Sequence, residues 1–183
     1  MAKMVGKQKD IAGLLNALIH VDLDAIEADG VAIERLEDDA DQAQLGEFRS
    51  DHERHVRELQ PLVTELGAEP VTKADFKRVL TKGKVVLAAL VGDRLILTAM
   101  KTNAYDTNLA YDQALGRDDL PAHVRELLLR NRDDERRHLA YIEKRLAQYE
   151  LTEPGEAEPP SRAAGAQASE IDVAQAGKVP SAR

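Results

Sequence analysis

The sequence contains no cysteine and no tryptophan, and it has only two phenylalanines and four tyrosines. Without cysteine, disulfides, zinc–thiolate sites, iron–sulfur clusters and catalytic thiols are all excluded. Any metal ion must therefore be held by nitrogen and oxygen atoms. Because aromatic residues are scarce, Leu, Ile, Val and Ala have to fill the core, and the abundance of Leu and Ala favours amphipathic helices. We therefore expect an all-α protein.

The chain also has no excess of basic residues and no long run of apolar residues. The chain carries 33 acidic and 25 basic residues, which gives a formal net charge of -8. Nucleic acids and anionic membranes attract concentrated positive charge, so neither is expected as a partner. No segment approaches the roughly 20 apolar residues that span a bilayer, and the N-terminal apolar stretch is too short for a secretory signal. These features predict a cytoplasmic protein.

Four amphipathic segments are present, at about residues 10–39, 40–67, 93–115 and 121–149. Their lengths and short connections predict a four-helix bundle. A further amphipathic stretch at 73–91 predicts a long helical crossover, which would let the third bundle helix run parallel to the second. Gly67 is expected to end the second helix, and Asp93 is expected to cap the third.

Residues 151–183 differ in composition from the rest of the chain, because they are rich in Pro, Ala, Gly, Ser and Glu and contain little to bury. This composition is typical of disorder. We therefore predict one domain at residues 1–150 and a disordered tail at 151–183. The tail is either passive or a tether to a larger assembly.

Acids and histidines interrupt the apolar seams of three predicted helices, at positions where leucines are expected. They are Asp22 and Asp29 in the first helix, His52 and His55 in the second, and Glu135 and His138 in the last. Burying such groups costs free energy unless each finds a partner. Either a closed network of acid–histidine pairs or a divalent cation would satisfy them. Pairs of possible ligands three residues apart recur in two helices, and this recurrence makes a metal site a specific hypothesis beside the closed network.

Three segments resemble the ferritin-like superfamily, including its bacterioferritin and rubrerythrin types. "LLNALIHVDLDAIEAD" is similar to the first helix of these proteins, "DHERHVRELQPL" to the second and "DERRHLAYIEKRL" to the last. The resemblance covers residues 10–149. It implies a ferritin-like fold and a metal site made of Asp22, His52, His55, Glu135 and His138, in which Glu135 bridges two ions and His52 replaces a glutamate.

The third helix departs from this family, because Ala104 stands where a carboxylate is usual. Asn103 and Asp106 are the nearby oxygen donors. The loss of that carboxylate, together with His52, leaves a single-ion site and a degenerate site as alternatives to a pair of ions. Tyr105, Tyr111 and Tyr141 are further candidates, as hydrogen-bond donors around the site.

The resemblance implies iron or manganese as cofactor, with oxidase, peroxide-scavenging or iron-handling activity in a stress response. The alternative is a structural or interaction bundle whose buried polar residues only fix the helix register. In the alternative, no metal is bound. The sequence does not decide whether the protein is an enzyme. Ferritin-like proteins commonly associate, so a homo-oligomer is also expected.

Overall fold

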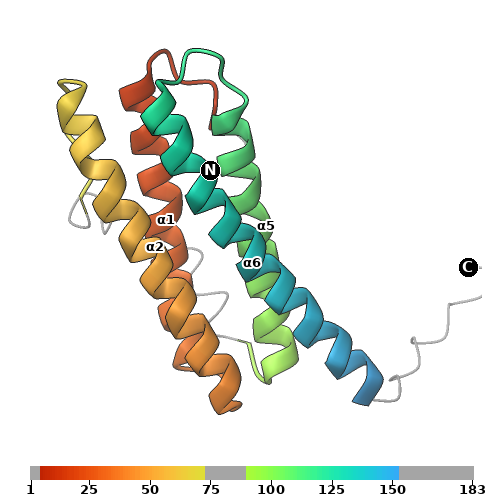
Figure 1. The fold of residues 1–183 in the computed structure, drawn as a ribbon. Coiled ribbons are helices and arrows are strands. Elements are labelled where there is room, and N and C mark those ends of the chain that lie inside the picture. The colour runs from red at the N-terminus through yellow and green to blue at the C-terminus, as the bar shows by residue number, and fades with distance from the viewer. Residues whose placement is uncertain (1–4, 73–89, 153–183) are drawn as a thin grey trace, which may run out of the picture. The chain divides into compact units, whose positions relative to one another are not determined.

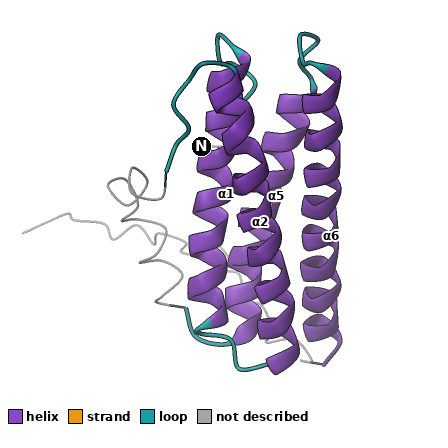
Figure 2. Cartoon of the chain, turned by 60° about the vertical axis from the view of Figure 1, so that its left-hand side comes forward, coloured by secondary structure: helices purple, strands orange, loops and turns teal. Residues whose placement is uncertain are grey.

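The computed structural model describes residues 5–72 and 90–152, and this part of the chain consists of four α-helices without strands (Figures 1 and 2). The helices are α1 (Ile11–Ile33), α2 (Asp39–Glu65), α5 (Asp93–Leu115) and α6 (Ala122–Thr152). α1 packs against α2 and α5, and α6 packs against α5 and α2. The predicted all-α four-helix bundle is therefore confirmed.

Hydrogen bonds at the two ends of the bundle define its topology. Near the start of α1, the Asn16 side chain donates to the carbonyl of Glu69, which follows α2, at 2.9 Å. At the opposite end, Arg35 donates to the carbonyl of Leu90, which precedes α5, at 2.9 Å. α2 and α5 therefore run in the same direction (Figure 1), as predicted. The predicted crossover helix falls mainly on residues 73–89, which lie outside the described residues.

The helix ends confirm one of the two capping predictions. Gly67 follows α2 with a φ of 76°, which favours glycine, and the amide of Ala68 donates to the Val63 carbonyl at 3.1 Å. Asp93 does not cap α5, because the N-cap residue is Gly92. The Asp93 carboxylate instead accepts hydrogen bonds from the amides of residues 37 and 38, both at 2.9 Å. It thereby joins the start of α5 to the α1–α2 loop.

The interior contains two apolar clusters and a polar layer. One cluster includes Leu14, Leu18 and Leu128, and the other includes Phe48, Leu97 and Ile142. The groups between them are buried acids, histidines and amides from all four helices. Since the periodicity of an amphipathic helix fixes which residues face inward, the predicted seams of α1, α5 and α6 are buried as expected. On α2, the same spacing buries Leu45, Phe48, His52, His55 and Leu59, but Leu66, just after the helix, is 46% exposed.

None of the described helices is long and apolar enough to cross a membrane. The predicted disorder of the tail and its tethering role concern residues beyond Thr152, which are not part of the description. The observed α6 extends three residues past the predicted end at Tyr149.

Candidate metal centre

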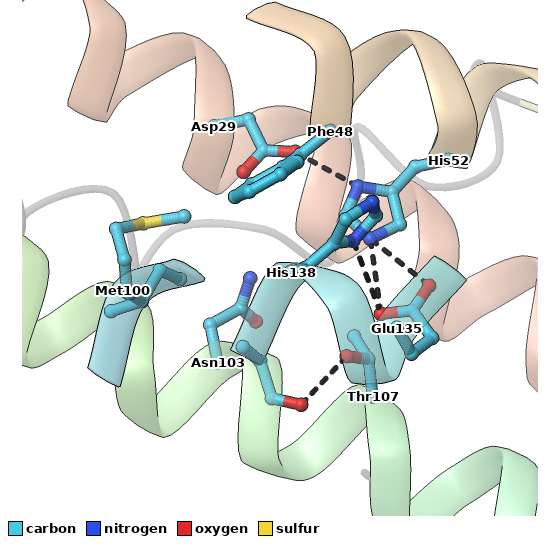
Figure 3. A pocket seen from close by; sticks show the side chains of 10 residues that line it. Asp29, Phe48, His52, Met100, Asn103, Thr107, Glu135 and His138 are labelled. Atoms are coloured by element: carbon cyan, nitrogen blue, oxygen red, sulfur yellow. Dashed lines mark hydrogen bonds and ion pairs between the residues drawn. The ribbon is translucent and has the colours of Figure 1, made fainter. Parts of the chain in front are cut away.

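The five predicted site residues lie together in the polar layer, and each is at most 3% exposed. They come from three helices: Asp22 from α1, His52 and His55 from α2, and Glu135 and His138 from α6. Figure 3 shows the part of this layer where His52 and His138 meet Glu135. Helical spacing explains the arrangement, because residues three or four apart share one face of their helix.

Glu135 occupies the middle of two groups of possible ligands. One group is Asp22, His55 and Glu135, and the other is His52, Glu135 and His138. In each group, the three candidate ligand atoms lie within 4.8 Å of one another. We call them the Asp22 triad and the His52 triad. Because Glu135 belongs to both, its two oxygens could each serve a different ion.

Several atoms of the two triads lie near one another without hydrogen bonds. His55 Nδ1 is 3.4 Å from Glu135 Oε1 and 3.6 Å from Asp22 Oδ1, and none of the three atoms has a hydrogen-bond partner among the described residues. His138 Nδ1 is likewise unbonded, at 3.7 Å from Glu135 Oε2. Buried polar atoms in proteins are normally hydrogen-bonded, so these convergent exceptions need an explanation.

Each histidine uses its other ring nitrogen on an aspartate at the edge of the layer. His52 Nδ1 is 2.9 Å from Asp29 Oδ2, and His138 Nε2 is 3.0 Å from Asp51 Oδ2. His55 Nε2 is 3.3 Å from Asp134 Oδ2. We call Asp29, Asp51 and Asp134 the outer aspartates. In metal sites, such carboxylates fix the ring orientation and tautomer of a ligating histidine, so that the remaining nitrogen faces the ion.

α5 contributes a tyrosine hydroxyl group to the surroundings of the Asp22 triad, but it contributes no carboxylate to either triad. The Tyr111 hydroxyl donates to Asp22 Oδ2 at 2.8 Å, so the other oxygen of Asp22 stays available. Ala104 is buried at the position where the resemblance implies a carboxylate, and Asp106 is exposed. Asn103 is half-buried and borders a cavity beside the His52 triad. Of the two predicted oxygen donors, only Asn103 therefore lies near the layer.

The edge between α2 and α6 carries a reciprocal set of ion pairs. Arg54 from α2 contacts Asp51 at 2.6 Å and also binds Asp134 across the interface. Arg137 from α6 contacts Asp134 at 2.9 Å and also binds Asp51 across the interface. Arginines three residues after an aspartate on a helix commonly form solvated pairs within that helix. Arg54 and Arg137 do more, because both also link the two helices next to His55 and His138.

The carboxylates and imidazoles strongly shift one another's pKa. Burial lowers the pKa of His55, but the hydrogen bond to Asp134 and the nearby carboxylates of Asp22 and Glu135 outweigh it and raise the value to about 10. Burial also disfavours the charged form of His52, yet Glu135 raises the His52 pKa well above its usual value. Burial raises the pKa of Asp22, whereas the histidines hold the pKa of Glu135 well below its usual range. In the metal-free layer, the cationic imidazoles of His52 and His55 therefore face the anionic carboxylate of Glu135.

Three predicted tyrosines have different places. Tyr111 contacts Asp22 as described, whereas Tyr105 is 61% exposed on α5. The Tyr141 hydroxyl donates to Asp41 at 2.7 Å, near the start of α2 and away from the two triads. Tyr111 is therefore the candidate that the structure brings to the site.

Asp51 and Asp134 were not among the predicted residues, and Asp29 was noted only as an interruption of the seam. A repeat in the sequence could have found the first two. The stretches "DHERH" at 51–55 and "DERRH" at 134–138 share Asp, Arg and His at the same spacing. This repeat produces the reciprocal contacts, because the aspartate of each helix reaches the histidine of the other.

The comparisons with known proteins identify a family. A family described as a domain of unknown function (DUF2383) matches residues 10–117, more than half of the 183-residue chain. The chain belongs to this family. The DUF2383 match includes Asp22, His52 and His55 and ends before α6, which carries Glu135 and His138. Neither the curated proteins nor the solved structures gave a significant match.

The chemistry of the donor set fits a metal pair. Imidazole nitrogens and carboxylate oxygens are ligands that iron, manganese and zinc all accept in proteins. The unbonded atoms Asp22 Oδ1, His55 Nδ1, Glu135 Oε1 and His138 Nδ1 all belong to the two triads. Convergent nitrogen and oxygen atoms that make no hydrogen bonds are the arrangement that a bound cation requires.

Proposed function

We propose that this protein is a ferritin-like metal protein that binds two iron or manganese ions, one in each triad. The observation that carries the proposal is the position of Glu135, whose carboxylate is shared by the Asp22 triad and the His52 triad. The ferritin-like resemblance of residues 10–149 and the parallel order of α2 and α5 support the same assignment.

Residues around the two triads would hold the metal ligands in position. The outer aspartates hold three histidines by one ring nitrogen each, and Tyr111 holds one oxygen of Asp22. The apolar clusters on both sides of the layer would limit the access of water to the ions. Iron or manganese bound there would supply redox chemistry toward dioxygen or peroxide. The protein would then act as an oxidase, a peroxide scavenger or an iron-handling protein.

Metal loading followed by elemental analysis tests this proposal. Protein purified without chelators is loaded anaerobically with ferrous iron, and separately with manganese, and the bound metal is counted by mass spectrometry. We expect about two ions per chain. His138→Ala should reduce this to about one ion, because it removes a ligand of the His52 triad only. The double variant with His55→Ala should bind neither ion.

His123→Ala is the matched control, because His123 lies on α6 but is exposed and outside both triads. It should retain the wild-type metal content. One ion in the wild-type protein would contradict the paired site and favour a single-ion centre. No ion under any loading condition would leave the alternative function, a structural bundle in which the acid–histidine contacts fix the helix register.

A further inference from the structure

A small cavity lies against one triad. It is lined by all three members of the His52 triad and has a volume of about 10 Å³ (Figure 3). That volume is close to the minimum that holds one water-sized molecule. The cavity therefore offers room for a very small ligand next to His52, Glu135 and His138.

The opposite wall of the cavity comes from α5. Met100, Asn103, Ala104 and Thr107 line it, and the Thr107 hydroxyl is already used on the Ala104 carbonyl at 2.9 Å. Ala104 leaves space because its side chain is a single methyl group. In the ferritin-like resemblance, this is the position of the missing carboxylate. The space that a longer acidic side chain would fill is therefore part of the cavity.

The Asp22 triad has a different neighbour on α5. Tyr111 is fully buried there, and its phenol fills the space beside Asp22 while its hydroxyl is bonded to the carboxylate. The two triads also differ in donors, since the Asp22 triad has one histidine and two carboxylates and the His52 triad has the reverse. The two positions are thus chemically unequal.

One residue that lines the cavity, Asn103, is partly exposed to solvent. It is half-buried, whereas every other lining residue is buried. Figure 3 shows its amide directed into the space between Met100 and His138. Within residues 5–72 and 90–152, the Asn103 side chain makes no hydrogen bond. Asn103 is therefore the side chain whose movement would admit a small molecule to the cavity.

We infer that an ion in the His52 triad keeps a coordination position open toward this cavity, and that an external ligand of dioxygen size binds there and not at the Asp22 triad. The inference rests on the proposed metal pair. Ala104 sets the space for the ligand, and Met100 limits its length. Ligands much longer than a diatomic molecule are excluded, because the volume of the cavity is only about 10 Å³.

Ligand binding to the iron-loaded protein tests the inference separately from activity. Nitric oxide serves as the diatomic probe and azide as the longer probe, both added anaerobically to the ferrous protein and followed by absorbance. We expect about one nitric oxide per chain. Ala104→Val should weaken nitric oxide binding about tenfold, because the added methyl groups occupy the cavity. Iron content, measured by elemental analysis, should stay at the wild-type value.

A second variant enlarges the cavity, whereas Ala104→Val reduces it. Met100→Ala should strengthen azide binding about tenfold, because it lengthens the space beside the triad. Leu97→Ala is the matched control, since it removes a buried side chain of the same helix that does not line the cavity. It should leave the affinity for both probes as in the wild-type protein.

Three results would overturn the inference. The first is two nitric oxide molecules per chain, which would mean that both triads accept ligand. The second is iron-loaded Ala104→Val and Met100→Ala protein with unchanged affinity for both probes. In these two cases the metal pair stands and only the ligand position is wrong. The third is a wild-type protein that binds no iron, which contradicts both the proposed function and the inference.

Discussion

In the core of the bundle, His55 Nδ1 lies 3.4 Å from Glu135 Oε1, and neither atom has a hydrogen-bond partner among the described residues. The opposite nitrogen of the same ring lies 3.3 Å from Asp134 Oδ2. One side of the imidazole is therefore fixed and the other is left for a ligand.

The outer aspartates should tune metal affinity without changing the number of ions bound. Asp134→Asn keeps the size of the side chain but removes the charge beside His55, and it should weaken binding at the Asp22 triad by about 10–100-fold. Competition with a chromophoric chelator measures the affinity. Asp133→Asn on the same helix is the control, because that carboxylate is 68% exposed and contacts neither triad. Equal affinities in the two variants would contradict the orienting role of Asp134.

Tyr111→Phe should destabilise the metal-free protein by about 1–3 kcal/mol. The change removes the hydroxyl that donates to buried Asp22 at 2.8 Å and leaves that oxygen without its partner. Urea unfolding of chelator-treated protein measures the free energy of unfolding. Tyr105→Phe, at a residue 61% exposed, should have no measurable effect. A Tyr111→Phe protein as stable as the wild type would show that the hydroxyl does not support Asp22.

Metal binding should release protons at pH 7. His55 is protonated in the metal-free protein, because its pKa is raised from 6.5 to about 10. Metal ions bind the neutral imidazole, so the apparent affinity should increase as the pH rises toward 10. Calorimetric titration in two buffers with different ionisation enthalpies counts the protons. Binding that releases no proton and does not vary with pH would contradict this assignment.

The stability of the metal-free protein should fall as the pH rises, whereas its affinity for metal should increase. A histidine with a raised folded-state pKa stabilises the fold fully below its unfolded pKa and loses this contribution as pH rises through the folded value. For His55 this window extends from about pH 6.5 to about pH 10. His55→Asn should lack this part of the pH dependence. Urea midpoints measured across the window provide the check.

The ion pair between Asp41 and Arg145 should stabilise the fold whether or not metal is bound. The Asp41 side chain is fully buried and accepts hydrogen bonds from Arg145 Nε at 2.6 Å and from Tyr141 at 2.7 Å, which joins α2 to α6. Arg145→Met should cost about 3 kcal/mol, because it leaves a buried charge without its counter-ion. Arg136→Met, at a side chain 55% exposed, should cost about 1 kcal/mol or less. Similar losses in both variants would show that Asp41 does not depend on Arg145.

The inward position of the acids and histidines could be predicted from the sequence, because it depends only on helical periodicity. His52 and His55 follow Phe48 on the seam of α2, and all three are buried. The parallel order of α2 and α5 was also predictable, since a long connection between two helices allows the chain to return along the bundle.

The outer aspartates depend on contacts between helices, which periodicity does not reveal. Asp51 and Asp134 each stand one position before a seam residue, where charged residues usually face solvent. Their partners lie on the other helix of the α2–α6 pair. The cavity beside Ala104 was equally hidden, because its volume depends on how α5 packs against α6. The missing carboxylate was visible in the sequence, but the space that it leaves was not.

An anomalous difference map from crystals of the iron-loaded protein directly tests whether two ions share the Glu135 carboxylate. Iron scatters anomalously near its absorption edge, so each bound ion should give a separate peak. We expect two peaks, one on each side of the Glu135 carboxylate, the first beside Asp22 and His55 and the second beside His52 and His138. A single peak, or iron bound away from Glu135, would contradict the shared-carboxylate site.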